Sequence, residues 1–512
     1  MRKPIIHSGQ EWTFELIEEV YSHLERIAAE KYQLDTYPNQ LEIISSEQML
    51  DAYSCGALPI IYPHWSFGRI FIHYLETYKR GYMGLAYEVV INSDPCIAYL
   101  MEENTMLVQA LVMAHACFGH NTVYKTNYLF KQWTDASSII DYLIFAKRYV
   151  RECEEKYGED RVEAILDAAH SLSPHGIDKF KRPSKLSAVE EEKMRKERDA
   201  HIQGQINDVW RTVPGTKPSI QKDKDDELFP KEPQENLLYF IEKNAPKLKD
   251  WERELIRIVR KVTQYFYPQT QMRVLHEGAA CFFHYKLMHD LYDERIIDEG
   301  AMFEFNRMHS AVVYQRDYDD KYYEGNVYAL GWNLFKEIER VSMTPTEDDI
   351  RWFGKQNWVG GGDWLSSIKF AIKNFKDESL IQQFLTPKLI RDFRLFVIVD
   401  DENDPKLEVS AIHDDRGYKH IRNTLSQQFN RGYTIPDIQI VNVDRWGDRS
   451  MMLQHQMINR RPLHAQSTTE TLKHLSFLWG YPIKLQSIDQ DGSTRSVYEV
   501  KDEKTILDIF LD

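Results

Sequence analysis

The segment Val274-Leu275-His276-Glu277-Gly278-Ala279-Ala280-Cys281-Phe282-Phe283-His284-Tyr285 places a His-Glu pair and a second histidine in apolar, aromatic surroundings. We interpret it as a helix in the core of the fold. Titratable groups are rarely buried without a partner or a task, because their desolvation costs several kcal/mol. The segment approaches the H-E-x-x-H motif of zinc peptidases, which needs a second histidine at position 280. This chain has Ala280 there, so the zinc-peptidase motif is excluded.

Helix geometry predicts which of these side chains share a face. Glu277, Cys281 and His284 are spaced by four and three residues and form one stripe, whereas His276 lies about 80° around the helix from His284. Glu277 and His284 would be about 10 Å apart along the axis, which is long for two ligands of one metal ion. Three interpretations remain open: a buried Glu–His hydrogen-bonded pair, a metal site, or acid–base catalysis without a metal.

A second histidine pair lies in Met113-Ala114-His115-Ala116-Cys117-Phe118-Gly119-His120-Asn121. On a continuous α-helix the two histidines would point about 140° apart, unless Gly119 ends the helix and frees His120. Glu102 and Glu103 supply carboxylates one element earlier. The alternative is two unrelated polar spots. If the fold brings the segments together, the predicted metal ligands are His115, His120, Glu103, Glu277 and His284, and the predicted catalytic residues are Glu277 and His284.

Composition narrows the functional classes. The chain has 512 residues and a formal charge of −15, without a long Lys/Arg cluster, which weighs against general nucleic-acid binding. The five cysteines are odd in number and contain no C-x-x-C, so we expect reduced thiols. The N-terminus lacks the apolar core of a signal peptide, and no apolar run is long enough to span a bilayer. We therefore expect a cytoplasmic protein.

The pattern of apolar residues predicts an α+β fold. Helical periodicity covers about residues 10–180 and 236–384, interrupted by a charged linker or excursion at about 183–233. Both histidine segments lie in these helical stretches, so we expect one mainly helical domain over 1–385. From residue 393 the period becomes that of strands, in the order ββα-ββα-ββ. We expect a smaller α+β domain at 393–512, with a duplicated ββα unit and a sheet with helices on one face.

Several blocks together resemble the SpoVR family, named for stage V sporulation protein R, and most of all its proteobacterial members of the YcgB type. The resemblance extends over nearly the whole chain. It departs from the family pattern at Ala279, where a tryptophan is usual, and at His276, where some members have asparagine. This variation shifts the functional expectation from His276 to Glu277 and His284. The matching blocks are His64–Gly68, Ile97–Asn104, Ala114–Asn121, Tyr267–Gln269, His276–His284 and Asn326–Trp332.

The resemblance implies a role in stress response or in formation of the cell envelope and the spore cortex, a specialised peptidoglycan. It also implies that the protein is encoded beside a PrkA-type serine kinase and a von Willebrand A-domain protein, which are therefore its expected partners. One hypothesis is therefore a metal- or carboxylate-dependent hydrolase of cell-wall material, with a divalent metal such as zinc as its cofactor. The alternative hypothesis is a non-catalytic regulatory or scaffold protein that works with that kinase and that A-domain protein.

Overall fold

The computed structural model describes residues 4–56, 58–79, 88–179, 229–315, 326–395, 397–399, 408–411, 413–430, 435–444, 447–457, 461–502 and 505–510. The chain divides into two compact units. The first comprises Met1–Glu163 and Gln264–Ile435, and the second comprises Ala164–Thr263 and Pro436–Asp512. Helices α8 (Glu159–Ser171) and α11 (Asp250–Thr270) each contain a division point between the units.

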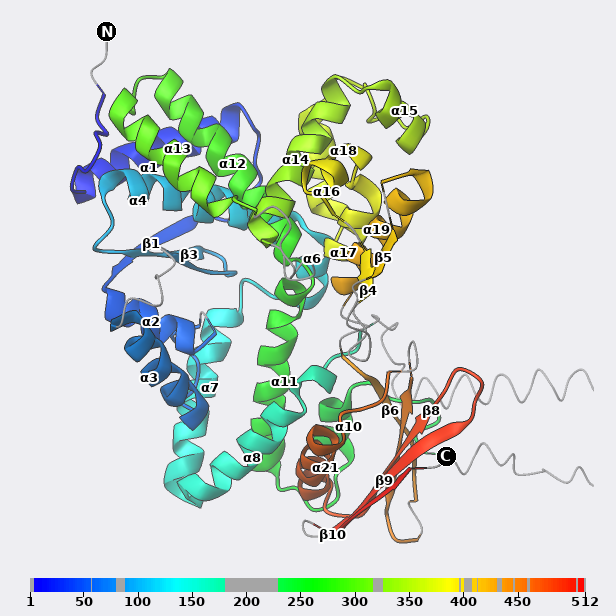
Figure 1. Ribbon diagram of the computed structural model, residues 1–512. Helices are drawn as coiled ribbons and strands as arrows, with labels where there is room; N and C mark the ends of the chain where they lie inside the picture. Colours follow the sequence, from blue (N-terminus) through cyan, green and yellow to red (C-terminus); the bar gives the residue numbers. More distant parts are fainter. Residues whose placement is uncertain are drawn as a thin grey trace, which may run out of the picture. The chain divides into compact units, whose positions relative to one another are not determined.

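The first unit is mainly helical (Figure 1). It also contains a three-stranded sheet of order β1-β3-β2, in which β1 runs parallel and β2 antiparallel to β3. This sheet was not predicted from the sequence. In chain order its elements are α1 (Phe14–Glu30), β1 (Asn39–Ile44), α2 (Ser46–Ser54), α3 (Trp65–Lys79), β2 (Glu88–Ile91), β3 (Cys96–Met101), α4 (Met106–Met113), the π-helix η1 (Ala114–His120), α5 (Asn121–Thr126), α6 (Tyr128–Trp133), α7 (Ile139–Tyr157), α12 (Arg273–Asp293), α13 (Glu299–Val312), α14 (Val327–Met343), α15 (Glu347–Phe353), α16 (Trp364–Asn374), α17 (Asp377–Phe384), α18 (Pro387–Asp392), β4 (Val397–Val399), β5 (Glu408–Ala411) and α19 (Asp415–Gln428).

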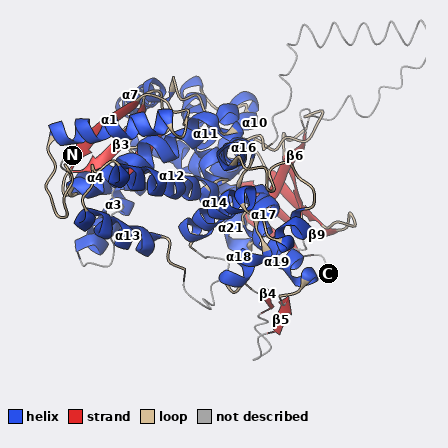
Figure 2. Cartoon of the chain, turned by 90° about the horizontal axis from the view of Figure 1, so that it is seen from above, coloured by secondary structure: helices blue, strands red, loops and turns tan. Residues whose placement is uncertain are grey.

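Helix α12 lies in the core of the first unit, in contact with η1, α4 and α14 (Figure 2). Its buried residues occupy most of its circumference, as expected for a helix surrounded by other helices. Glycines allow two of these contacts to be close. A Cβ on Gly278 would lie 2.4 Å from the carbonyl carbon of Gly331 in α14. A Cβ on Gly119 in η1 would lie 2.6 Å from the Cα of Ala280.

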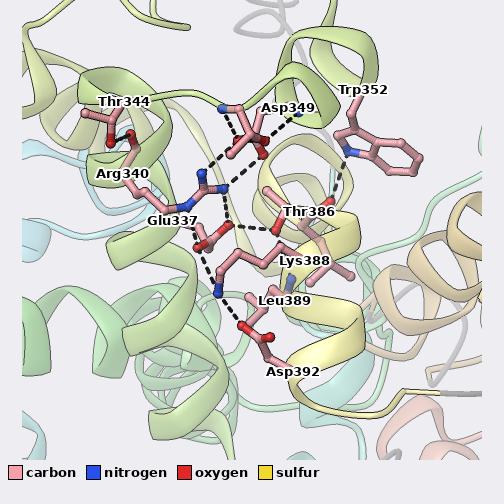
Figure 3. Close-up of polar contacts among 11 residues, drawn as sticks. Glu337, Arg340, Thr344, Asp349, Trp352, Thr386, Lys388, Leu389 and Asp392 are labelled. Carbon is pink, nitrogen blue, oxygen red and sulfur yellow. Dashed lines mark hydrogen bonds and ion pairs between the residues drawn. The ribbon is translucent and has the colours of Figure 1, made fainter.

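A buried ionic network stabilises the α14–α15–α18 corner of the same unit (Figure 3). The Arg340 guanidinium donates to both oxygens of Glu337, at 2.9 and 2.7 Å, and to both oxygens of Asp349, at 2.7 and 2.9 Å. Glu337 also accepts from the Thr386 hydroxyl at 2.8 Å, and Asp349 accepts from the Thr346 hydroxyl at 2.7 Å. These bidentate pairs use the fork geometry that makes arginine–carboxylate contacts strong.

The second unit contains a five-stranded sheet of order β10-β9-β8-β7-β6, with α21 packed against β8 and β9 (Figure 1). Only the β7–β8 pair is parallel. Buried and half-buried residues alternate along β7 and β8, because one face of each strand packs into the core. Its elements besides parts of α8 and α11 are the 3-10 turn η2 (Ser173–His175), α10 (Leu237–Asn244), β6 (Asp437–Val443), β7 (Met451–Gln456), α21 (Ala465–Trp479), β8 (Ile483–Ile488), β9 (Thr494–Asp502) and β10 (Thr505–Phe510).

The predicted α+β class and the predicted order of strands and helices after residue 393 are confirmed, with β10 as an additional strand. The first two strands of that order, β4 and β5, pair with each other but form a two-stranded sheet of their own. They belong to the first compact unit, so the units are divided differently from the predicted domains 1–385 and 393–512. Most of the predicted charged linker at 183–233 lies outside the described residues.

Candidate metal centre

Helix α12 holds the first histidine segment in place. It starts at Arg273, and the Asp377 carboxylate accepts hydrogen bonds from the backbone N–H groups of Val274 and Leu275, at 3.0 and 2.8 Å. This carboxylate satisfies donors that the first helical turn leaves unpaired. Burial raises the pKa of Asp377 to about 7, although these backbone donors act in the opposite direction. The N-terminus of α12 is thereby fixed a few residues before Glu277.

The second histidine segment is π-helical, between α4 and α5. A π-helix closes hydrogen bonds between residues five apart, so such residues lie one turn apart on the same face. His115 and His120 are five apart, and their ring centroids are 4.5 Å from each other. The expectation from a regular α-helix was therefore wrong. Gly119 does not end the helix, which continues as α5.

Close packing of the two segments brings their histidines together. Gly119 faces Ala280, and even a Cβ at 119 would approach the Cβ of Ala280 to 2.9 Å. A histidine at position 280 would not fit against η1, which gives a steric reason for the missing residue of the peptidase motif. The structure brings His115, His120, Glu277 and His284 into one buried cluster.

Three side chains of this cluster, together with Glu88, have the spacing of metal ligands. His115 Nε2 lies 3.3 Å from Glu88 Oε1 and 3.5 Å from Glu277 Oε2. His120 Nε2 lies 3.6 and 3.7 Å from the same two oxygens. Donors held at metal–ligand distances of 2.0–2.2 Å in a tetrahedron are about 3.3–3.6 Å apart, whereas charge-assisted hydrogen bonds are about 2.7–2.9 Å long. We refer to Glu88, His115, His120 and Glu277 as the donor set.

The donor set is incompletely satisfied by protein groups. Among the described residues, Glu88 Oε2, Glu277 Oε2 and His120 Nδ1 are buried and have no hydrogen-bond partner. Such atoms are uncommon in folded proteins and call for an explanation such as a bound ion. The Glu88 and Glu277 side chains keep 18% and 23% of their surface exposed, although these Oε2 atoms are buried.

Electrostatics favours charged forms of two of these ligands. Burial would raise the pKa of Glu277, but His120 and His115 outweigh it and lower that pKa to about 2. Burial would lower the pKa of His115, but Glu88 and Glu277 outweigh it and raise that pKa. The site therefore presents carboxylate oxygens to whatever cation occupies it, a proton on imidazole or a metal ion.

His284 was predicted as a metal ligand, but both of its ring nitrogens already have partners. Its Nδ1 lies 2.7 Å from His115 Nδ1, and its Nε2 lies 2.8 Å from His309 Nδ1. The first distance is a hydrogen bond and is too short for two nitrogens that bind one ion. The structure thus places His284 directly behind His115, outside the donor set.

Two further residues border the donor set. The His276 ring stacks on His120 with centroids 4.1 Å apart, and its buried Nε2 has no hydrogen-bond partner among the described residues. His276, His120 and Glu277 also have ligand atoms within 4.8 Å of one another, so His276 is available as an additional ligand. Cys281 lies beside His115 and His284 at similar range. Burial raises the pKa of the Cys281 thiol well above its usual value, which keeps the thiol protonated.

Glu103, the remaining predicted ligand, lies away from the cluster. It is exposed between β3 and α4, and its Oε1 accepts a hydrogen bond from the Ser46 backbone N–H at 3.3 Å. Glu103 precedes α4, whereas His115 lies about 14 Å further along the helical path, so the two cannot share an ion. Glu88 at the start of β2 supplies the second carboxylate instead. A glutamate immediately before the apolar run Val89-Val90-Ile91 was the only signal in the sequence.

The chemistry of the donor set fits a divalent transition metal. Two imidazole nitrogens and two carboxylate oxygens suit zinc, manganese or ferrous iron, and a thiolate-selective ion would need ligands that are absent from this set.

Within the described residues, no helix combines the length and apolar character needed to cross a bilayer.

Comparisons with known proteins agree over most of the chain. A family model described as "SpoVR like protein" matches residues 11–434, and one described as "SpoVR-like C-terminal domain" matches residues 436–490. The Escherichia coli (strain K12) protein YcgB is 52% identical over 489 residues, which are 95% of each chain. No solved structure matches the chain.

Proposed function

The chain belongs to the SpoVR-like family, and we propose that it is a metal-dependent enzyme whose ion is held by Glu88, His115, His120 and Glu277. The observation that carries this proposal is the spacing of the donor set. All four histidine–carboxylate distances fall between 3.3 and 3.7 Å, longer than the 2.7–2.9 Å that is typical of charge-assisted hydrogen bonds. Neutral or paired side chains that only brace a core would be expected to close these gaps to hydrogen-bond length.

The reaction class that fits the site best is hydrolysis. A divalent ion bound there would supply Lewis-acid chemistry and lower the pKa of a bound water. Tyr328 lies next to Glu277, and burial, then Glu277 and Glu88, raise the pKa of its phenol. Tyr328 therefore stays protonated and is able to donate a hydrogen bond to a substrate oxygen. We assign His284 to the support of His115, because its ring nitrogens contact His115 Nδ1 and His309 Nδ1.

The substrate that we propose is cell-wall material or one of its precursors, as the family resemblance implies. All five cysteines are free thiols, which favours a reducing compartment, so we propose that the protein acts in the cytoplasm and in stress response or envelope formation. A cytoplasmic enzyme would act on precursors or on the inner side of the envelope.

Metal content tests the proposal. Untagged wild-type protein, loaded with zinc, manganese or ferrous iron and then desalted, should retain about one ion per chain by plasma mass spectrometry. Glu88→Ala, His120→Ala and Glu277→Ala should lose that ion while remaining folded by circular dichroism. Glu103→Ala is the matched control, because it removes an exposed carboxylate between β3 and α4 and should leave metal content unchanged. Folded wild-type protein that retains none of the three metals would overturn the proposal.

A regulatory role has one observation in its favour. Residues 436–490 match a family model of their own, and their sheet lies in the second compact unit, apart from the donor set in the first. We propose that this sheet region docks the serine kinase or the von Willebrand A-domain protein that the resemblance implies. Pull-down of either protein by wild type, and its loss on substitution of exposed residues of α21, would support docking. Equal capture by all variants would count against it.

A further inference from the structure

Three buried histidines form a continuous chain behind the donor set. His115 Nδ1 contacts His284 Nδ1 at 2.7 Å, and His284 Nε2 contacts His309 Nδ1 at 2.8 Å. The three side chains come from η1, α12 and α13 and are 8%, 3% and 5% exposed. His115 Nε2, at the other side of its ring, is a member of the donor set.

The number of hydrogen-bond donors and acceptors on the three histidines allows few arrangements of their protons. A neutral imidazole carries one N–H donor and one lone-pair acceptor. In one arrangement His115 Nδ1 donates to His284 Nδ1, and His284 Nε2 donates to His309 Nδ1. In the reverse arrangement both hydrogen bonds point toward His115, whose Nε2 then carries the proton. Only the first arrangement leaves a lone pair on His115 Nε2 for a metal ion.

The surroundings favour neutral rings at the far end of the chain. Burial lowers the pKa of His309 to about 4, with His289 and Lys336 acting in the same direction. The His309 ring lies between Trp332 and Tyr285, with centroids 4.7 and 5.0 Å away, so its orientation is fixed by packing. With its proton on Nε2, a neutral His309 accepts at Nδ1; this Nε2 is buried and has no hydrogen-bond partner among the described residues.

We propose that His284 and His309 are positioning residues that select the His115 tautomer whose Nε2 binds the metal ion. The inference rests on the proposed function, because it concerns the affinity of the same site. Neither residue touches the ion. Metal-binding histidines commonly donate their second ring N–H to such an outer partner, and loss of that partner typically reduces metal affinity by 10–100-fold.

Variants of His309 test this role without altering the donor set. His309→Phe keeps an aromatic ring but removes the acceptor for His284 Nε2–H, so the hydrogen-bonded series of histidines ends at His284. We expect it to weaken binding of Zn²⁺ by about 10–100-fold in competition with a chelator of known affinity. His309→Asn places a side-chain oxygen near the position of Nδ1 and should restore most of the affinity. His420→Phe changes an exposed histidine of α19 and is expected to bind like wild type.

The tautomer itself gives a second measurement. In protein with 15N-labelled histidine loaded with Zn²⁺, we expect His115 and His284 to be neutral, with the proton on Nδ1 and Nε2 respectively. The thermal midpoint of each variant shows whether lost packing accounts for a change in affinity. Equal Zn²⁺ affinity of wild type and folded His309→Phe would refute the positioning role and leave the proposed metal site intact. Wild type without bound metal would refute both.

Discussion

The two buried charge clusters of the first unit have similar compositions but are satisfied to different degrees. In the α14–α15–α18 network, one guanidinium joins two carboxylates by four hydrogen bonds of 2.7–2.9 Å. In the donor set, two imidazoles face two carboxylates at 3.3–3.7 Å and leave buried atoms without partners. The network is complete with protein groups alone, whereas the donor set leaves buried atoms unpaired, which the proposed metal ion would satisfy. Satisfaction of hydrogen bonds, more than burial or charge, separates a structural cluster from a binding site.

The largest expected effect is on the complete network. Arg340→Ala would leave the buried Asp349 carboxylate without its cationic partner and Glu337 with Lys388 Nζ at 3.9 Å, which we expect to lower the free energy of unfolding by about 3–5 kcal/mol. Urea denaturation measures this loss. Metal content of the folded variant should equal that of wild type. A loss below about 1 kcal/mol would mean that the network is no more stabilising than a surface ion pair.

Metal addition should affect only the donor set. At a free metal concentration of about 100 times Kd, binding to the folded state stabilises wild type by about 2.7 kcal/mol. We expect the thermal midpoint to rise with metal and fall again with a chelator. Glu88→Ala should show neither change, and Arg340→Ala should show both. A metal-induced shift that persists in Glu88→Ala would place the ion elsewhere.

The next largest expected effect concerns the packing between η1 and α12. Gly119→Ala would introduce a methyl group 2.6 Å from the Ala280 Cα, so the two helices must separate. We expect a loss of about 1–3 kcal/mol in the free energy of unfolding, together with weaker metal binding. Gly68→Ala is the control, because its Cβ would meet no atom within 4 Å in helix α3. Equal stability and metal affinity of the two variants would contradict the close packing.

The smallest expected effect is a pH dependence of the complete network. Burial would raise the pKa of Asp349, but Arg340 and Thr346 outweigh it and lower that pKa below its ordinary value. The unfolded chain therefore takes up the proton first, and the stability from this group, present above about pH 4, is lost as pH falls further. The free energy of unfolding should fall more between pH 7 and pH 3 for wild type than for Asp349→Asn. Equal drops would remove this group as the cause.

Local patterns predicted much of the fold. Helix periodicity located the helices around both histidine segments, and strand alternation located β6, β7 and β8 to within one or two residues. The β1–β3 pairing was missed because it joins residues 39–44 to 96–101 in parallel, and such pairing leaves no local turn signal.

The candidate site was only partly predictable for a similar reason. His115, His120 and Glu277 stood out because they are polar residues in apolar helices. Their convergence depends on the contact of Gly119 with Ala280, which joins segments more than 150 residues apart. Glu88 lies outside both histidine segments, so nothing in those segments pointed to it, and Glu103 was chosen as the nearest carboxylate in sequence.

The π-helix η1 also determines how the site would respond to a change in the length of the chain. His115 and His120 share a face because one turn of η1 contains an additional residue compared with an α-helical turn. Deleting a single residue between them, such as Ala116, would allow a regular α-helix with the histidines four apart. Six α-helical residues turn about as far as seven π-helical ones, so the side chains of α5 would keep nearly the same direction. A one-residue deletion inside η1 should therefore preserve the register of α5, whereas the same deletion within α5 would turn every later side chain of that helix by about 100°.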